Sequence, residues 1–408
     1  MRLRHPDGTL VHLAYCTNVH PAEDLAGILG QLDTFALPVR EALGADVLGL
    51  GLWLAAPVAA ALAGDPALRA RLRHELDARG LEVVTFNGFP YETFHAPVVK
   101  HAVYRPDWTD RRRLDYTLDL ARVLADLLPE GAARGSISTL PFGWRDPWGP
   151  DDADDAARLF DALAVGLAAL DGPPVRVAVE PEPGCVVETT AQAVAALAGV
   201  DTDRIGLCLD LAHLACAWED PAGAVARLDA AGLPVVKTQV SAALEVTDPR
   251  SAAAVLAGYA EPRFLHQTRT RSGAAYDDLP EALAADPDGP WRVHFHVPLH
   301  AEPAPPLSGT TPVLRAGLAA LVGGERARCD HLEVETYTWN VLPEDRRPRD
   351  DGELVVGIAA ELAFAHGELL ALGLTPVGSA PDRAAAGPGP DRAGTGSVSL
   401  PAAGAVAR

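Results

Sequence analysis

The chain has 408 residues, of which 48% are hydrophobic, and its formal net charge at pH 7 is −21. This length allows a large buried core, whereas such an acidic chain is unsuited to steered binding of nucleic acid or anionic membranes. Five scattered cysteines without CxxC spacing predict reduced thiols in a cytoplasmic protein, and no run of about 18 uncharged apolar residues predicts membrane insertion.

Short apolar segments alternate with Ala- and Leu-rich helical stretches along most of the chain. This alternation is typical of a parallel sheet whose strands are connected by helices. The segments expected to form strands are residues 10–16, 47–53, 81–87, 135–140, 175–180, 205–210, 235–240 and 331–336. Eight such repeats predict an α/β fold, the (β/α)8 or TIM barrel.

Some segments do not fit eight regular repeats. A ninth strand-like run, 291–300, lies in the long span 241–330, which must hold either an insertion between the last two strands or an irregular seventh unit. Residues 88–108 form a long aromatic-rich segment that we expect to cover the mouth of the barrel. Residues 376–408 are rich in Gly, Pro, Ala and Ser without an apolar period, which predicts a disordered tail after a single domain, 1–375.

Acidic residues lie at the ends of three predicted strands. Glu180 and Glu182 share one strand face, as do Glu333 and Glu335, and Asp210 ends a further apolar run. Buried carboxylates are costly unless they are paired or bind a cation, so we expect one divalent metal (Mn, Mg, Co or Zn) here. For each acid taken singly, the alternative is a helix N-cap or a loop salt bridge.

Histidine and lysine residues add to this predicted site. His213 follows Asp210 by three residues, so both face one side if a helical turn starts at Asp210, although that acid could equally cap the helix. His294 and His296 share a strand face and suit a transition metal, unless they form a structural histidine cluster with His266.

The strand 235–240 carries two further candidates, Lys237 and Gln239, on one face. The chain contains a single other lysine, so we interpret Lys237 as a charge-paired or substrate-binding group, with a snorkelling surface lysine as the alternative. Asn18 and Asn87 end two strands, where their amides would bind substrate hydroxyls or carbonyls or, alternatively, form turns.

Several motifs resemble one known family, the metabolite traffic protein EboE group of the xylose isomerase-like sugar phosphate isomerase/epimerase superfamily. They span residues 15 to about 343. The motifs include Tyr-Cys-Thr-Asn-Val-His-Pro (15–21), Phe-Asn-Gly-Phe-Pro-Tyr (86–91), Glu-Pro-Glu-Pro-Gly (180–184), Cys-Leu-Asp-Leu-Ala-His (208–213), Phe-Leu-His-Gln (264–267), His-Phe-His-Val-Pro (294–298) and Glu-Val-Glu-Thr-Tyr-Thr-Trp (333–339). The resemblance implies a TIM barrel that holds a divalent metal through Glu180, Asp210 and Glu335, with either Gln239 or His296 as a fourth ligand. It also implies that His213 contacts the substrate.

We therefore expect a metal-dependent isomerase or epimerase acting on a small polar metabolite, such as a sugar-like or cyclitol ketone, in a biosynthesis or export pathway. The alternatives are metal-assisted hydrolysis and a non-catalytic protein that carries the metabolite. The expected catalytic residues are Glu180, Glu335, His213 and Lys237; the expected substrate-binding residues are Asn18, Asn87, Tyr91, Glu182, His266 and His294; and the expected metal ligands are Glu180, Asp210, Gln239, His296 and Glu335.

Overall fold

A closed barrel of parallel strands forms the centre of the computed structural model, which describes residues 1–378. Each barrel strand pairs with the next along the chain, and the last pairs with the first to close the ring. The barrel strands are β2 (Leu10–Cys16), β3 (Leu48–Trp53), β4 (Leu81–Asn87), β5 (Gly135–Thr139), β6 (Val175–Val179), β7 (Ile205–Asp210), β8 (Val235–Val240) and β14 (His331–Val334). The predicted (β/α)8 fold is thus confirmed.

The strand boundaries fall within two residues of those expected, because strands buried on both faces are nearly continuous apolar runs. In β3, Leu-Gly-Leu-Gly-Leu-Trp, every residue is buried. The strand β14 is the shortest of the barrel and ends at Val334, so Glu335 lies in the loop that follows.

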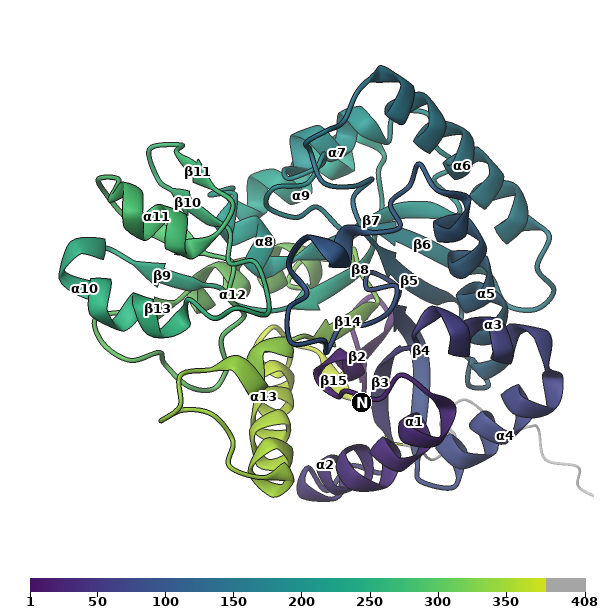
Figure 1. Cartoon of the computed structure of the whole chain (residues 1–408). Helices are drawn as coiled ribbons and strands as arrows, with labels where there is room; N and C mark the ends of the chain where they lie inside the picture. Colours follow the sequence, from purple (N-terminus) through teal and green to yellow (C-terminus); the bar gives the residue numbers. More distant parts are fainter. Residues whose placement is uncertain (379–408) are drawn as a thin grey trace, which may run out of the picture. The chain divides into compact units, whose positions relative to one another are not determined.

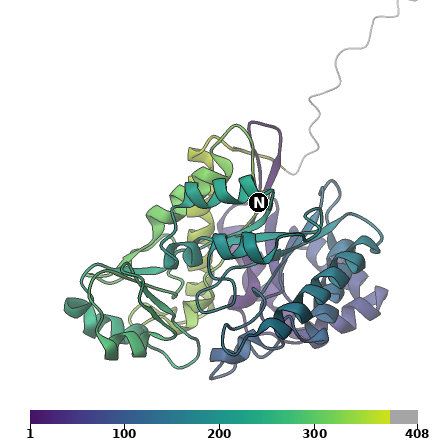
Figure 2. The ribbon, with the colours of Figure 1, turned by 90° about the horizontal axis from the view of Figure 1, so that it is seen from above.

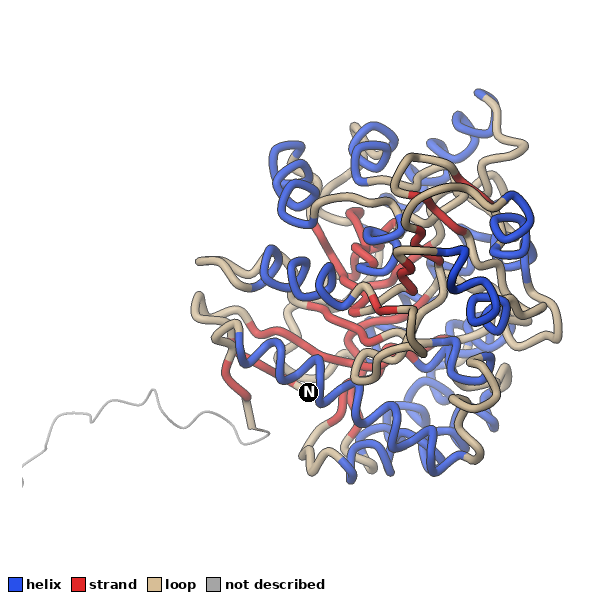
Figure 3. The backbone as a smooth tube through the Cα atoms, turned by 90° about the vertical axis from the view of Figure 1, so that its left-hand side faces the viewer, coloured by secondary structure: helices blue, strands red, loops and turns tan. Residues whose placement is uncertain are grey.

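Helices form the outer layer of the barrel and enclose its strands (Figure 3). Acidic caps begin many of them: Asp65 accepts a hydrogen bond from the first turn of α4, and Asp220 does the same for α9, each followed by proline. The helices of this layer are α1 (Leu25–Gln31), α2 (Leu37–Ala42), α3 (Ala56–Gly64), α4 (Pro66–Asp77), α5 (Arg111–Leu127), α6 (Pro150–Ala168), α7 (Thr190–Ala196), α8 (Leu211–Cys216), α9 (Pro221–Ala231), α12 (Thr311–Val322) and α13 (Asp351–Ala371).

A second, antiparallel sheet lies between β8 and α12 in the chain. It forms part of the green lobe at the left of Figure 1, which is also separate from the barrel helices in Figure 2. Its strand order is β11-β10-β12-β9-β13. The elements of this lobe are β9 (Leu244–Val246), α10 (Pro249–Leu256), β10 (Thr268–Thr270), β11 (Ala275–Tyr276), α11 (Leu279–Ala285), β12 (Trp291–Val293) and β13 (Ser308–Gly309).

The ninth strand-like run, 291–300, belongs to this second sheet rather than to the barrel. Only Trp291–Val293 is a strand, and the chain then leaves the sheet: the amide of Val297 donates to Ala242 and that of His294 to Gln267. The loop keeps the alternation of a strand, since the Phe295 ring packs on Tyr259 while the histidines on either side face the barrel mouth.

Two short strands, β1 (Arg2–Arg4) and β15 (Thr375–Pro376), pair beside β2. The helix before β15, α13, is long and apolar enough to span a membrane by length and composition. It packs on β2, α2 and α12, as a core helix of a globular domain does. The expected tail is 376–408, and its residues 379–408 lie outside the part of the chain that the structure describes.

An ion pair is buried in the barrel interior. Lys237 Nζ lies 2.6 Å from Glu333 Oε2, and both side chains are completely buried. Gly51 on β3, the second strand from β14 around the barrel, leaves space for this carboxylate, because a Cβ at that position would lie 1.2 Å from Glu333 Oε1. The fold therefore depends on glycine here for close packing.

The variant Gly51→Ala should lower the free energy of unfolding by about 1–3 kcal/mol, since the added methyl group overpacks a site whose neighbour is held by Lys237. Urea unfolding would measure this loss. Gly30→Ala in α1 is the matched control, because a Cβ there meets no atom within 4 Å and alanine favours the helix. Equal unfolding midpoints for the two variants would contradict the packing argument.

Candidate active site

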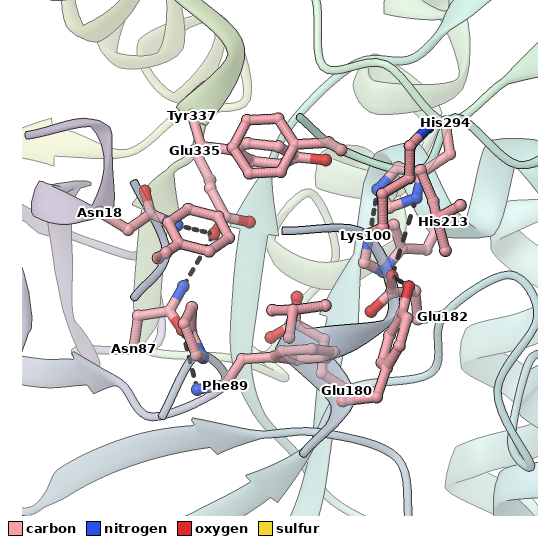
Figure 4. A pocket seen from close by; sticks show the side chains of 16 residues that line it. Asn18, Asn87, Phe89, Lys100, Glu180, Glu182, His213, His294, Glu335 and Tyr337 are labelled. Carbon is pink, nitrogen blue, oxygen red and sulfur yellow. Dashed lines mark hydrogen bonds and ion pairs between the residues drawn. The ribbon is translucent and has the colours of Figure 1, made fainter. Parts of the chain in front are cut away.

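The ends of the barrel strands surround one cavity, drawn in Figure 4. Its polar wall comes from strand-end loops, α8, Lys100 and the loop after β12, and its apolar wall comes from residues 88–108 and the loops at 264–265 and 337. The polar side chains are Asn18, Asn87, Lys100, Glu180, Glu182, His213, His294 and Glu335, and the remaining lining residues are Phe89, Pro90, Phe94, Val103, Tyr104, Phe264, Leu265 and Tyr337.

The aromatic segment 88–108 is tied to the second lobe around residues 99 and 100. The amides of Val99 and Lys100 both donate to the carbonyl of Arg263, at 2.7 and 2.9 Å, and Lys100 forms an ion pair with Asp278. The rings of Phe94, Phe264 and Tyr337 then pack together, with centroids 5.0–5.6 Å apart. The apolar wall of the cavity is therefore built jointly by this segment and the second lobe.

Three predicted acids are brought together here: Glu180 and Glu335 line the cavity, and Asp210, which does not line it, lies close enough to act on both. Burial raises the pKa of Glu180 well above its ordinary value, and the charge of Asp210 raises it further. Burial and then the charge of Glu180 have the same effect on the pKa of Glu335. A bound cation would offset this repulsion between like charges.

Glu335 is held by both of the asparagines predicted from the strand ends. Asn18 Nδ2 and Asn87 Nδ2 donate to the same oxygen, Glu335 Oε1, at 2.8 and 2.7 Å (Figure 4). These amide groups were expected to bind substrate, but in the structure their donors orient a carboxylate. These two amides do not engage the second oxygen of Glu335, Oε2.

Asp210 caps a helix, which was the alternative to its predicted role as a metal ligand. Its Oδ1 caps α8 by accepting hydrogen bonds from the His213 amide and the Ser241 hydroxyl, both at 2.8 Å. Its Oδ2 is buried and has no hydrogen-bond partner within residues 1–378. One oxygen therefore serves the fold, and the other remains as a ligand atom.

Three imidazoles lie beside these acids. His213 is on α8, while His294 and His296 come from the loop after β12 in the second lobe. Burial lowers the pKa of His213 to about 4 and also lowers the pKa values of His294 and His296, so all three rings are neutral at pH 7. Neutral imidazole is the form that binds metal.

Glu182 ends a chain of hydrogen bonds that leads to His294. Tyr104 donates its hydroxyl to Glu182 Oε1 at 2.6 Å and accepts from Gln267 Nε2 at 2.8 Å. The other atom of this amide, Gln267 Oε1, lies 2.7 Å from His294 Nδ1. Burial raises the pKa of Glu182 to about 8.

Lys237 and Gln239 lie on β8, deeper than the cavity wall. Lys237 donates to the carbonyl of Phe86 at 3.0 Å, and although burial alone would lower its pKa, the Glu333 carboxylate raises it. Lys237 is therefore a charged, ion-paired side chain. Gln239 is opposite Asp210 in the sheet, and both of its amide atoms are buried without a partner in the described part of the chain.

Two predicted substrate-binding residues lie away from the cavity wall. His266 Nδ1 lies 3.0 Å from the carbonyl of His294, to which it can donate, and its Nε2 lies 2.9 Å from Glu261 Oε1, so both of its ring nitrogens are engaged in the second lobe. Tyr91 packs edge-on against Tyr116 on the side of α5.

The sequence reasoning missed Gln267, Tyr337 and Glu361. Gln267 directly follows the selected His266 and precedes β10, so strand alternation did not indicate it. Glu361 is buried in α13, where it accepts hydrogen bonds from Leu299, Thr336 and Trp339 and so fixes the loops that carry His296 and Glu335. The signal in the sequence that could have indicated Glu361 is an acidic residue within an apolar helical run.

The donor atoms present fit a divalent cation. In each of two groups, the candidate ligand atoms lie within 4.8 Å of one another. The first group comes from Glu180, Asp210 and His213, and the second from Asp210, His296 and Glu335. Glu180 Oε2, Asp210 Oδ2 and His296 Nε2 are also buried and have no partner among the residues the structure describes. Buried polar atoms normally find partners, so such convergence indicates a missing ligand.

Comparisons with known proteins agree with this fold. The sequence model of the xylose isomerase-like TIM barrel family matches residues 39–278. No curated protein matches the sequence.

Three similar solved structures each have a TM-score below 0.5. An L-ribulose 3-epimerase is 14% identical, with 89% of this chain and 95% of that chain covered and a TM-score of 0.48. A xylose isomerase-like TIM barrel protein from Mycobacterium smegmatis, in complex with magnesium, is 14% identical, with 88% and 98% covered and a TM-score of 0.48. The D-psicose 3-epimerase from Clostridium cellulolyticum H10 is 13% identical, with 88% and 99% covered and a TM-score of 0.46.

Proposed function

Because the chain belongs to the xylose isomerase-like TIM barrel family, we propose that it is a metal-dependent isomerase or epimerase of a small sugar-like or cyclitol ketone. The observation that carries this proposal is the arrangement of three buried strand-end acids: Asp210 shares one group of candidate ligand atoms with Glu180 and another with Glu335. The residues that would hold the cation are these acids together with His296 or Gln239.

A divalent cation in this position would polarise a substrate carbonyl and its neighbouring hydroxyl, which lowers the pKa of the adjacent C–H bond. The chain itself supplies the groups that move the proton. Burial raises the pKa of both Glu180 and Glu335, and it is raised further by the charge of Asp210 for Glu180 and by the charge of Glu180 for Glu335, which favours a state in which one of the two carboxyls keeps its proton and the other is ionised. That state provides one base and one acid.

In the proposed reaction, the ionised carboxylate removes the proton from the carbon next to the carbonyl, and the electron pair moves onto the carbonyl oxygen to give an enediolate. The protonated partner then returns a proton to carbon. Asn18 and Asn87 orient Glu335 through its Oε1, which leaves Oε2 for this transfer.

The walls of the cavity support a substrate that carries both hydroxyl groups and C–H faces. Carboxylates, amides and imidazoles on one side can bind hydroxyls, whereas Phe94, Phe264 and Tyr337 present aromatic surface on the other. The net charge of −21 is unfavourable for a polyanionic substrate such as nucleic acid.

The proposal is tested by hydrogen exchange in D2O. The protein would be loaded with Mn²⁺, Mg²⁺, Co²⁺ or Zn²⁺ and mixed with ketopentoses, ketohexoses and keto-cyclitols, and proton NMR would follow deuterium uptake next to the carbonyl. We expect uptake on at least one of these compounds, its loss after chelation and its return when the cation is restored. Tight binding of such a compound without any exchange would instead favour the carrier function.

A finer assignment rests on the motif resemblance to the metabolite traffic protein EboE group. We propose on that basis that the substrate is a polyol or cyclitol intermediate of a biosynthetic or export pathway in the cytoplasm. The buried free thiols, such as Cys208 and Cys216, are compatible with a reducing compartment.

A second candidate function is metal-assisted hydrolysis, which the three imidazoles favour because hydrolytic metal centres often use histidine ligands. Cleavage of a chromogenic phosphate diester by the metal-loaded protein, with no exchange on any ketone, would support this function over isomerisation.

A further inference from the structure

A second cavity lies between the second lobe and the part of the chain that follows β14. Its volume is about 220 Å³, compared with about 60 Å³ for the cavity of the candidate active site. The two cavities share no lining residue within the described part of the chain. The residues of the second cavity that carry the following argument are Tyr259, Val297, His300, Trp339, Leu342 and Arg346.

The aromatic wall of the second cavity is held in place from behind. Trp339 is buried, and its Nε1 donates to Glu361 Oε2 at 2.9 Å. Gly357 packs against the same ring, since a Cβ there would lie 2.6 Å from Trp339 Cη2. The ring of Tyr259 packs edge-on against Phe295, with centroids 5.0 Å apart. Such a wall loses little conformational freedom when a ligand binds to it.

His300 and Trp339 present two aligned rings to this cavity. Their planes differ by 23°, and their centroids are 6.1 Å apart. Burial lowers the pKa of His300, so this imidazole is neutral at pH 7 and adds no charge. A flat ligand ring can therefore stack in the direction that these two rings define.

The cationic group of the second cavity is Arg346. Its Nη1 donates to the backbone carbonyl of Glu302 at 2.8 Å, and its Nε is buried without a hydrogen-bond partner among the described residues. The nearby Arg349 pairs with Glu353, whereas Arg346 has no ion-pair partner in residues 1–378, although the chain is strongly acidic. A guanidinium binds one carboxylate through two parallel N–H···O bonds. Arg346 is therefore suited to an anion from outside the chain.

We propose that the second cavity is a binding site for a small planar carboxylate, whose acid group binds Arg346 and whose ring stacks against His300 and Trp339. The site lies outside the candidate active site and does not depend on the proposed function. Its volume is below the roughly 300–1,000 Å³ of pockets for drug-sized ligands, so the ligand has one ring or two fused rings.

The charges around Arg346 favour a ligand with a single negative charge. The cavity opens into a wider hollow that shares His300, Trp339 and Arg346 with it, and the exposed acids Glu344 and Asp345 line that hollow. These acids would repel a polyphosphate or another multiply charged anion. One carboxylate matches the one unpaired guanidinium.

The test is binding of fluorinated acids to the full-length protein, followed by ¹⁹F NMR. The compounds are 4-fluorobenzoate, 5-fluorosalicylate and 5-fluoroindole-3-acetate, each compared with its neutral amide. We expect saturable binding of at least one acid, and binding of its amide weaker by a factor of about 10 or more, because the amide cannot form the charged pair with Arg346.

Variants then locate the bound acid. Arg346→Gln should weaken binding by a factor of about 10–100, the usual effect of losing hydrogen bonds to a charged group. Arg122→Gln is the matched control and should bind as the wild type does, because Arg122 pairs with Asp119 on α5 and lines neither cavity. His300→Ala should weaken binding by a factor of about 2–10 through the lost stacking. Circular dichroism would establish that each variant is folded.

Several results would overturn this proposal. They are the absence of saturable binding of all three acids, equal binding of an acid and its amide, and wild-type affinity in Arg346→Gln, which would place the acid elsewhere, for example in the candidate active site. Equal weakening by Arg122→Gln would do the same, because it would indicate a general charge effect. If Arg346→Gln does not fold, His300→Ala still decides the matter, since it removes an exposed ring, and unchanged affinity in that variant would exclude the site.

Discussion

Replacing Glu335 with glutamine should slow deuterium exchange at the substrate carbon by a factor of about 10²–10⁴, the usual contribution of a general acid or base. The change is conservative in shape, because glutamine keeps an oxygen that can accept the hydrogen bonds of Asn18 and Asn87. The loss should therefore appear in kcat, with little change in the urea midpoint. Rates from NMR in D2O on the compound found by the exchange screen would measure it.

Glu180→Gln should reduce the exchange rate by a similar factor, because the proposed reaction needs one carboxyl as base and the other as acid. The exposed residue Glu302 provides the control, since Glu302→Gln removes a carboxylate charge outside the cavity. Full activity of either the Glu180 or the Glu335 variant would exclude that residue from proton transfer. Equal losses in all three variants would indicate a general charge effect.

The variant Lys237→Met should lose about 3–5 kcal/mol of folding free energy, because it leaves Glu333 buried without its partner. The pair is completely buried, and the Lys237 ammonium is also bonded to Phe86 and Ser138. Urea unfolding followed by circular dichroism would measure the loss.

The other lysine of the chain, Lys100, provides a matched control. Its ion pair with Asp278 is partly exposed, so Lys100→Met should cost no more than about 1 kcal/mol. The double variant Lys237→Met/Glu333→Leu removes both buried charges and should recover most of the lost stability. If the double variant is as unstable as Lys237→Met, the cost comes from packing rather than from an unpaired charge.

The barrel could be predicted from the sequence because its strands are buried on both faces. Such strands appear as short, continuous apolar runs, and their ends place acids at a common rim. For this reason Glu180, Asp210 and Glu335 could be selected without any structure. The second sheet was harder to predict, because its strands of two or three residues are too short for a periodic signal.

The partners of the site residues could not be predicted, since they are set by contacts distant in sequence. Asn87 is 248 residues from Glu335, and Tyr104 is 163 residues from Gln267. A strand pattern places an amide at the barrel mouth, but it does not say whether the amide faces substrate or a carboxylate. The same limit explains why His266 was selected and its neighbour Gln267 was not.

The site also lies across the seam of the barrel, where β14 pairs with β2. Asn18 follows β2 and Glu335 follows β14, so their hydrogen bond joins the first and last barrel strands above the line of closure. The described residues that converge here come from positions 18 to 335, and no partial barrel can assemble them. Cation binding is therefore coupled to closure of the barrel. A cation with affinity for these residues stabilises the closed barrel by mass action, and a bound cation indicates that β14 has paired with β2.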